Sequence, residues 1–342
     1  MKKLILDRID FAYNKSIKIF QDFSITFESI DDMGQVSAIM GTSGSGKTTL
    51  LKLLLGIENP QKGTINFYPE NPVISYVPQE PVLFDHLSIK DNARYFSFAG
   101  IHKKRFNEKL YQELVISLGL EGVINNGKSI NELSGGQKQR LSLLRALCIS
   151  PDFLLLDEPC NGLDAEVKRS FLNKLREVTE RYKLFVLYIT HHKLEAQLIA
   201  DNVVYLLPDK NDNVIKFPVI GSITDFMNMP PVLEAAKVFR FPDTKMLPVI
   251  EEENGIRIAS NNKEPNFYYL INEDNLKLGD EKGFKFKIIS RSPVYTVVRN
   301  EEANIEWMVA TNSLNDNISD DFLYISIAGD FLKYNNKGFL IK

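Results

Sequence analysis

A glycine-rich loop between a strand pattern and a helix pattern constrains the fold of this chain most strongly. Apolar residues predict a strand from Val36 to Met40, and a helix is expected from Thr48 to Leu55. The segment that joins them comprises Gly41, Thr42, Ser43, Gly44, Ser45, Gly46, Lys47 and Thr48, the last of which opens the helix. Glycines let a backbone wrap closely around phosphate oxygens, because a Cβ would obstruct the path. Successive N–H groups and the helix N-terminus then face the anion, so the sequence predicts a phosphate-binding loop.

Two side chains of this loop extend the prediction. Lys47 is expected to supply a point charge to the β- and γ-phosphates of a nucleoside triphosphate. The hydroxyl of Thr48 is placed to bind Mg²⁺. A chance match in a flexible loop is the alternative, and the flanking strand and helix patterns argue against it.

A buried strand that ends in two acids supports the same chemistry. The apolar run Phe153 to Leu156 is followed by Asp157 and Glu158. An Asp at such a strand end helps to hold Mg²⁺ in phosphate-loop enzymes, and Asp157 fits this role. Glu158 is then expected to face the γ-phosphate, where a carboxylate orients and polarises water. Taken alone, the pair reads equally well as two solvated acids, and the phosphate loop favours the catalytic interpretation.

Length and composition limit the remaining possibilities. With 342 residues the chain is too long for one typical core, so two domains are expected. Its net charge of -3 argues against whole-molecule electrostatic binding to nucleic acid. The cysteines Cys148 and Cys160 imply no disulfide framework and favour a reducing compartment. The N-terminus has too few apolar residues for a signal peptide, and no apolar run approaches the ~20 residues that span a bilayer.

The first part of the chain is expected to be an α/β P-loop NTPase domain. Up to about residue 207, short apolar runs such as Phe185 to Ile189 alternate with helical patterns. This alternation is typical of a mostly parallel sheet covered by helices. Residues 85–150 differ, because helical patterns at Asp91 to Gly100 and Lys103 to Leu118 indicate a helical subdomain.

The C-terminal part is expected to be a small all-β domain. Its β-branched and aromatic runs, separated by Gly, Asn and Asp, predict strands. These runs are Phe267 to Ile271, Lys285 to Ile289, Val294 to Arg299, Ile305 to Ala310 and Phe322 to Ile327. Phe217 to Pro248 reads as a connector that carries a helix from Pro231 to Val238. We therefore expect an ATP-binding domain at residues 1–220 and a β-rich domain at residues 221–342.

A second glycine-containing segment makes the prediction more specific. Leu133-Ser134-Gly135-Gly136-Gln137-Lys138-Gln139-Arg140 precedes a helical pattern from Gln137 to Leu147 and resembles the signature of ABC-type ATPases. The resemblance covers roughly residues 1–240, and the motifs occur in the order of that family. In the family this second helix N-terminus serves the nucleotide bound to the other subunit, so the resemblance implies a homodimer. The alternative is an ordinary N-capped helix.

The resemblance also implies roles for single residues. It assigns ATP binding to Tyr13, Gly41, Thr42, Ser43, Gly44, Ser45, Gly46, Lys47, Thr48, Thr49, Ser134, Gly135, Gly136, Gln137 and Asp164. It assigns catalysis to Glu158, His191 and Gln79, and Mg²⁺ binding to Thr48, Gln79 and Asp157. Tyr13 matches the aromatic residue that stacks on adenine, with Phe11 as its substitute. His191 matches the γ-phosphate contact, and Gly162 departs from the commoner residue of the loop that carries Asp164.

The same resemblance favours an importer subunit. No transmembrane segment is expected, and the β domain resembles regulatory domains of importer ATPases for oxyanions, sugars and polyamines. We expect a peripheral protein at the cytoplasmic face that works with permease subunits, indirectly with a solute-binding protein, and without nucleic acid. A short permease helix is expected beside Gln79, near Phe84 to Leu87.

The resemblance leaves several alternatives open. An oxyanion such as molybdate or sulfate is the expected solute, and sugars, polyamines and ferric iron remain alternatives. The β domain reads equally well as a passive packing module. The whole chain is alternatively a soluble ATPase acting on nucleic acid or the ribosome, an exporter ATPase with separate membrane subunits, or a non-hydrolysing binder.

Overall fold

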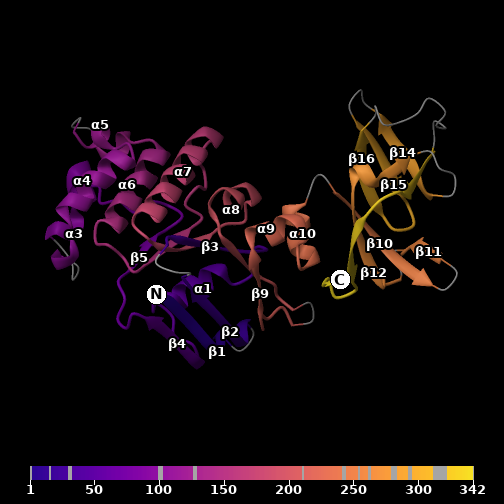
Figure 1. Cartoon of the computed structure of the whole chain (residues 1–342), viewed down its shortest axis with the longest axis horizontal. Helices are drawn as coiled ribbons and strands as arrows, with labels where there is room; N and C mark the ends of the chain where they lie inside the picture. The colour runs from indigo at the N-terminus through magenta and orange to yellow at the C-terminus, as the bar shows by residue number, and fades with distance from the viewer. Residues whose placement is uncertain are drawn as a thin grey trace. The chain divides into compact units, whose positions relative to one another are not determined.

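The computed structural model divides into two compact units, Met1–Ile223 and Thr224–Lys342 (Figure 1). It describes residues 2–14, 17–29, 33–98, 103–125, 129–209, 212–240, 244–252, 255–260, 263–278, 283–291, 295–310 and 322–341. Each unit has its own hydrophobic core and is considered by itself.

The first unit is built on a six-stranded sheet with strand order β5-β6-β7-β3-β8-β9. Its strands are β3 (Gln35–Gly41), β5 (Ile74–Val77), β6 (Phe153–Asp157), β7 (Phe185–Ile189), β8 (Asn202–Leu206) and β9 (Pro218–Ser222). Neighbouring strands from β5 to β8 run parallel, and β9 pairs antiparallel with β8. The expected α/β fold with a mostly parallel sheet is confirmed.

Both faces of the central sheet are covered, which explains the unbroken apolar runs of its strands. Phe153 and Leu155 of β6 belong to one core cluster, whereas Leu154 and Leu156 belong to the other. Successive strand residues point to opposite faces, so each face of β6 needs its own apolar residues.

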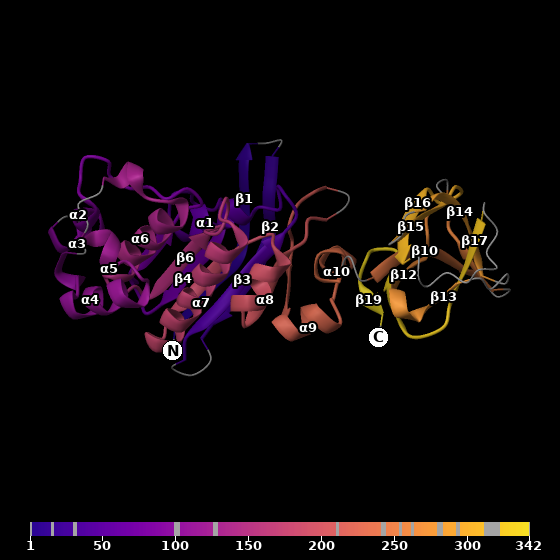
Figure 2. The same cartoon turned by 90° about the horizontal axis from the view of Figure 1, so that it is seen from above.

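A three-stranded antiparallel sheet covers one face together with helix α1 (Lys47–Leu54). Its strands are β1 (Lys3–Asn14), β2 (Ile17–Glu28) and β4 (Lys62–Tyr68), in the order β2-β1-β4. Figure 2 shows β1 and β2 from above. Alternate residues such as Leu4 and Leu6 are fully buried against the central sheet, so this sheet closes the core around α1.

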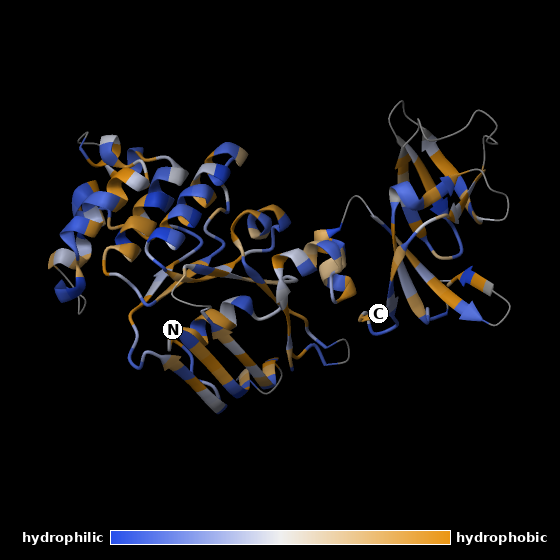
Figure 3. Ribbon diagram, viewed as in Figure 1, coloured by the Kyte–Doolittle hydropathy of each residue, from blue (hydrophilic) through white to orange (hydrophobic). Residues whose placement is uncertain are grey.

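Helices cover the other face of the central sheet. The elements that contribute to the core on this face are α2 (Ile89–Ala93), α4 (Glu108–Ser117), α5 (Glu121–Ile124), the 3₁₀ turn η2 (Ile130–Glu132), α6 (Gly135–Leu147), α7 (Ala165–Arg181) and α8 (Lys193–Ile199). Helix α3 (Tyr95–Phe98) and the 3₁₀ turn η1 (Lys103–Arg105) have no buried residue. Figure 3 shows hydrophilic and hydrophobic residues alternating along α7, whose buried face includes Phe171 and Leu175. None of the helices in the described ranges is long and apolar enough to cross a membrane.

Two helices expected in the helical subdomain are shorter than predicted. The helix expected from residue 91 is divided at Arg94 into α2 and α3, and its last expected residues lie outside the described residues. The helix expected from residue 103 begins only at Glu108, because the side chain of Asn107 accepts a hydrogen bond from the Leu110 N–H and starts a new helix there. A side-chain cap, which apolar periodicity does not reveal, therefore sets the start of α4.

The second unit contains two five-stranded antiparallel sheets, in the orders β11-β10-β12-β18-β19 and β13-β17-β14-β15-β16. The first comprises β10 (Thr244–Glu252), β11 (Gly255–Ile258), β12 (Phe267–Asn272), β18 (Phe331–Asn335) and β19 (Leu340–Ile341). The second comprises β13 (Leu276–Leu278), β14 (Phe284–Arg291), β15 (Tyr295–Asn300), β16 (Ile305–Ala310) and β17 (Phe322–Ile327), and the turn η3 (Glu273–Asn275) precedes β13. Buried residues of both sheets, including Val249 and Trp307, form one core. The expected all-β C-terminal domain is confirmed.

The segment expected as a connector has more structure than predicted. Pro218 to Ser222 forms β9 and completes the central sheet as its edge strand, where a proline is tolerated because only β8 pairs with it among the described strands. Helices α9 (Ile223–Asn228) and α10 (Leu233–Phe239) follow. Leu233 of α10 packs with Leu270 and Tyr334, so the predicted helix near residues 231–238 belongs to the core of the second unit.

Candidate functional site

The glycine-rich loop lies at the carboxyl end of β3 and leads directly into α1. Gly46 precedes α1 with a φ of 75°, a left-handed conformation that favours glycine. A Cβ on Gly41 would lie 2.4 Å from the Ser45 Oγ and 2.7 Å from the Leu206 carbonyl oxygen. A side chain at Gly41 would therefore force the loop apart, whereas Gly44 faces open space. The loop thus forms a cradle whose backbone an anion can approach closely.

The side chain of Lys47 lies within this cradle. Its Nζ donates to the carbonyl oxygens of Gly41 at 3.0 Å and Thr42 at 2.9 Å. Burial lowers the pKa of Lys47, and the charges of Glu158 and Asp157 oppose that shift. The ammonium is therefore placed where a phosphate in the loop would meet a positive charge. The other predicted loop residues divide by exposure: Thr42, Ser43 and Thr48 are exposed, and Ser45 and Thr49 are buried.

Asp157 and Glu158 lie where β6 ends. Asp157 is nearly buried, and the Tyr76 hydroxyl donates to its Oδ2 at 3.4 Å. Burial, and then the charge of Glu158, raise the pKa of Asp157, although Tyr76 and Lys47 partly oppose this shift. Burial and the charge of Asp157 also raise the pKa of Tyr76 to about 12, so this phenol stays a donor. A bound cation would relieve the unfavourable charge on Asp157.

Glu158 connects the end of β6 to the end of β7. Its φ is 42°, a conformation that non-glycine residues adopt rarely and that is often found at functional sites. Its N–H donates to the Ile189 carbonyl oxygen at 3.0 Å. Its Oε1 lies 2.9 Å from Nδ1 of His191, whose side chain is 51 % exposed. The pair can therefore meet a ligand from solvent while the backbone of Glu158 is fixed.

The topology brings most of the predicted residues to one edge of the central sheet. Strands β5, β6, β7 and β3 are parallel neighbours, so their carboxyl ends share an edge, which is where ligands bind in open α/β sheets. The glycine-rich loop, Asp157, Glu158 and His191 all follow these strand ends. Gln79 follows β5 at the same edge and is exposed. His192 packs against His191 with ring centroids 4.0 Å apart, and burial lowers the pKa of His192.

The signature residues form a second group at the N-terminus of α6. Ser134 caps this helix: its Oγ accepts from the Gln137 N–H at 3.3 Å, and the Gln137 side chain accepts from the Ser134 N–H at 3.0 Å. A Cβ on Gly136 would lie 2.3 Å from Val167 of α7, and one on Gly135 would lie 3.6 Å from Leu163. Gly136 therefore lets α6 begin tightly against the start of α7, whereas a Cβ on Gly135 would make only ordinary contact.

Asp164 belongs to this second group. It caps α7, and its Oδ1 accepts from the Val167 N–H at 2.9 Å. Gly162 has a φ of 72°, so the departure from the family pattern places a glycine where the backbone is left-handed. Throughout the described ranges, no hydrogen bond or ion pair joins this second group to the glycine-rich loop.

Tyr13 and Phe11 differ in accessibility. The Tyr13 side chain lies beside α1, with its hydroxyl 3.3 Å from the Thr49 Oγ1 and Lys52 above its ring. Tyr13 is 44 % exposed, whereas Phe11 is 3 % exposed and belongs to the core cluster of this region. Phe11 as a substitute for base stacking is therefore wrong, because its ring is buried.

The structure adds contacts that sequence reasoning did not single out. Tyr76 reaches Asp157 from β5, three residues before Gln79. Glu195 of α8 is buried and contacts the residue before His191. Both are polar residues within ordinary strand and helix patterns, so the sequence alone carries no signal for their contacts.

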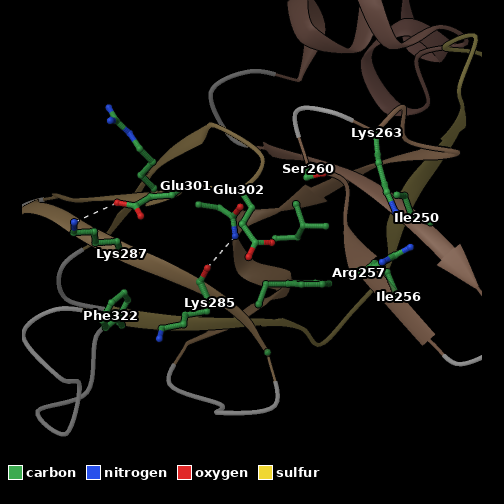
Figure 4. Close-up of a pocket in the computed structure, with 15 residues that line it drawn as sticks. Ile250, Ile256, Arg257, Ser260, Lys263, Lys285, Lys287, Glu301, Glu302 and Phe322 are labelled. Atoms are coloured by element: carbon green, nitrogen blue, oxygen red, sulfur yellow. Dashed lines mark hydrogen bonds and ion pairs between the residues drawn. The ribbon is translucent and has the colours of Figure 1, made fainter.

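The second unit contains a hollow of about 550 Å³ between its sheets (Figure 4). The cations of its lining are Arg257, Lys263, Lys285, Lys287 and Arg299. Three of them are ion-paired: Lys287 with Glu301 at 3.2 Å, Arg299 with Glu306 at 3.1 Å between Nε and Oε2, and Arg257 with a neighbouring carboxylate. Ligand binding by this unit stays a prediction.

Comparisons with known proteins place these features in a family context. Residues 23–161 match the family model described as ABC transporter. The chain is 36% identical over 214 residues to the Fe(3+) ions import ATP-binding protein FbpC 1 of Haemophilus influenzae, a match that covers 59% of this chain and 62% of that protein. It is 32% identical over 251 residues to the Fe(3+) ions import ATP-binding protein FbpC of Agrobacterium fabrum, with 69% of each chain covered.

A relative with a different solute in its name is similar as well. The chain is 32% identical over 237 residues to the Sulfate/thiosulfate import ATP-binding protein CysA of Mycolicibacterium paratuberculosis, covering 66% of this chain and 63% of that protein. The match spans 58–62% of the length of the first three curated relatives.

Solved structures support the fold. A protein described as a metal-chelate type ABC transporter in an inward-facing conformation aligns with a TM-score of 0.56 at 23% identity, covering 75% of this chain and 94% of that chain. A bacterial Atm1-family ABC exporter with ATP bound aligns with a TM-score of 0.53 at 23% identity, covering 66% and 40%.

Proposed function

The chain belongs to the ABC transporter family of ATP-binding proteins, and on this premise we propose that it hydrolyses ATP to power uptake of a small solute through separate permease subunits. The observation that carries the proposal is the 2.9 Å contact between His191 and Glu158 at the sheet edge that also carries the glycine-rich loop. A carboxylate beside a phosphate site can orient the attacking water.

The residues of this edge suit Mg-ATP. The loop cradle would hold the phosphates through its N–H groups, with Lys47 as the counter-charge and the exposed ring of Tyr13 available to stack on adenine. Thr48, Gln79 and Asp157 offer only oxygen ligands, which Mg²⁺ prefers, and Mg²⁺ usually uses one or two carboxylates plus phosphate oxygens. When bound, Mg²⁺ would neutralise charge on the phosphates.

Glu158 and His191 would act on the γ-phosphate side. Glu158 accepts a hydrogen bond from the attacking water and orients it, and His191 holds the carboxylate and contacts the γ-phosphate. The fixed backbone of Glu158 keeps this carboxylate in place, so little reorganisation is needed when ATP binds.

The signature group would complete the site of a second copy. Ser134 and the N-terminus of α6 present backbone N–H groups that suit a γ-phosphate, and they lie outside the cradle of their own chain. A two-fold homodimer would then hold two nucleotides between its subunits, with Asp164 in the loop that crosses the interface. ATP would favour the closed dimer, and hydrolysis would favour reopening.

A permease helix would bind beside Gln79. The loop at Phe84 to Leu87 is fixed by the fully buried Asn92, whose side chain bonds to the backbone of Phe84 and Leu87. The Phe84 ring lies 4.7 Å from that of Tyr95, and Arg145 lies over it. This rigid aromatic surface would transmit nucleotide state to a permease at the cytoplasmic face of the membrane, with a solute-binding protein acting indirectly.

An inorganic oxyanion such as sulfate or molybdate remains our proposed solute. The relative named for sulfate and thiosulfate import supports it, and ferric iron is the second candidate because the FbpC relatives are named for Fe(3+) import. Uptake of labelled sulfate, molybdate and ferric iron by cells expressing the unaltered chain or Lys47→Ala would distinguish them. The two candidate solute classes predict loss of uptake of one solute in the variant, and unchanged uptake of all three would contradict both candidates.

Phosphate release from Mg-ATP by the purified chain tests the ATPase proposal. Measurable turnover is expected. ATP binding without phosphate release would favour a non-hydrolysing binder, and activity that depends on added RNA or DNA would favour the nucleic-acid alternative.

A further inference from the structure

The carboxylate of Glu195 is buried beside the turn that carries His191. Glu195 belongs to α8, and its side chain is 2 % exposed. Its Oε2 accepts hydrogen bonds from the Thr190 Oγ1 at 2.8 Å and from the Tyr188 hydroxyl at 3.0 Å. Its Oε1 lies 2.8 Å from the Nζ of Lys168. A charge so deeply buried is stable only with such partners, so the cluster is held in one arrangement.

The hydroxyl of Thr190 links this cluster to the backbone around His191. Its hydroxyl donates to Glu195 and accepts from the His192 N–H at 3.0 Å, so both functions of the hydroxyl are used. Its own N–H donates to the Ile39 carbonyl oxygen of β3 at 3.3 Å. The backbone on both sides of His191 is therefore anchored, and one of the anchors depends on Glu195.

Lys168 extends the cluster to the second group of predicted residues. It lies one turn into α7, and its N–H donates to the Asp164 carbonyl oxygen at 2.9 Å. Cys160, in the loop between Glu158 and Asp164, lies 3.5 Å from the Tyr188 hydroxyl. The one carboxylate of Glu195 thus connects the turn of His191, the start of α7 and the loop that leads to it.

We propose that Glu195 is a positioning residue for His191. It also couples the position of that histidine to the Asp164 end of α7. This inference rests on the ATPase function proposed above. Glu195 itself would touch neither nucleotide nor water. Through Thr190 it fixes the turn that sets the 2.9 Å contact between His191 and Glu158. Misplacement of a catalytic group by about 1 Å can cost about 100-fold in rate, so a buried anchor of this turn matters for turnover.

The test compares two hydrogen bonds to the same carboxylate. Thr190→Val removes the bond that leads to the His191 turn, and Thr190→Ser keeps it. Tyr188→Phe removes a bond of similar length to the same oxygen and leaves the turn anchored. Because both deletions remove one buried hydroxyl, similar losses of thermal stability are expected, and only the turn distinguishes them.

The expected result is a lower kcat with little change in KM. Thr190→Val should lower kcat for ATP hydrolysis at least about tenfold with KM within about twofold, as expected when an interaction of the transition state is lost. Thr190→Ser and Tyr188→Phe should keep kcat within about threefold. Hydrogen exchange should be faster at the His192 amide in Thr190→Val alone, a readout that does not require activity.

Two results would overturn the proposal. One is a kcat in Thr190→Val close to that of the unaltered protein. The other is a loss of kcat in Tyr188→Phe equal to that in Thr190→Val, which would indicate a merely structural cluster. Absence of phosphate release by the unaltered protein, with ATP still bound, would instead overturn the proposed function on which the inference rests.

Discussion

His191 and Glu158 follow neighbouring parallel strands, and their side chains meet with 2.9 Å between Nδ1 and Oε1. The contact joins the ends of β6 and β7 beside the glycine-rich loop at the end of β3. It depends on strand order, because β7 lies between β6 and β3 in the central sheet. The geometry therefore places a carboxylate, an imidazole and an anion cradle at one sheet edge.

Replacing Lys47 with Ala should weaken nucleotide binding itself. The ammonium would be lost from the cradle, where it is placed to meet the phosphates. We expect the Kd for Mg-ATP, measured by titration calorimetry, to rise at least about tenfold, since a bond to a charged group contributes about 1.5–3 kcal/mol. The control is Lys62→Ala, because the Lys62 side chain is 77 % exposed on β4. Equal affinity in Lys47→Ala and the unaltered chain would contradict the loop assignment.

Replacing Tyr13 with Ala should weaken binding of the base. Its exposed ring is the proposed stacking surface, and base–aromatic stacking contributes about 1–3 kcal/mol per base. The Kd for ATP should rise accordingly, whereas Tyr13→Phe should bind nearly as the unaltered chain does. A similar loss in both variants would indicate that the hydroxyl contact with Thr49 matters instead of the ring.

Ser134→Ala should prevent ATP-dependent dimerisation while each chain still binds ATP. The change also removes the cap of α6, which costs about 0.5–2 kcal/mol of stability. Ser129→Ala is a matched control, because Ser129 and Glu132 form a capping box of the same kind at η2. Light scattering with Mg-ATP in a Glu158→Gln background measures the dimer. Equal dimerisation in both serine variants would show that Ser134 is only a cap.

Asp157→Asn should stabilise the nucleotide-free protein near neutral pH. Burial and the charge of Glu158 raise the pKa of Asp157, so the folded protein binds this proton more tightly than the unfolded chain does. The ionised side chain therefore destabilises the folded protein, and stability is regained as the pH falls through the raised pKa. The Tm advantage of the variant should be larger at about pH 7.5 than at about pH 3.5, below the ordinary pKa of 3.8, and a constant or inverted difference would contradict this.

The central sheet and the phosphate loop were predictable because each has a characteristic local pattern in the sequence. Apolar runs such as Phe185 to Ile189 are typical of a strand buried on both faces. The segment Gly41 to Thr48 has the glycines that its backbone path requires. The antiparallel sheet β2-β1-β4 was not predicted, although β1 alternates between buried and more exposed residues as a half-buried strand does.

Contacts between distant segments could not be predicted from the residues alone. Tyr76 and Asp157 are 81 positions apart, and only the pairing of β5 with β6 brings them together. Glu195 reads as a surface acid of a short helix, and its burial depends on Lys168 from another helix. Likewise, Pro218 to Ser222 reads as a linker until β8 offers an edge to pair with.

Phosphate release at saturating Mg-ATP, compared between the unaltered chain and Glu158→Gln, tests the central claim most directly. The substitution keeps the shape of the side chain and a hydrogen-bonding oxygen near His191 but removes the charge that polarises water. We expect kcat to fall at least about 100-fold, within the range of general acid–base contributions, with ATP still bound at unchanged affinity. A kcat equal to that of the unaltered chain would contradict the assignment of hydrolysis to the Glu158–His191 pair.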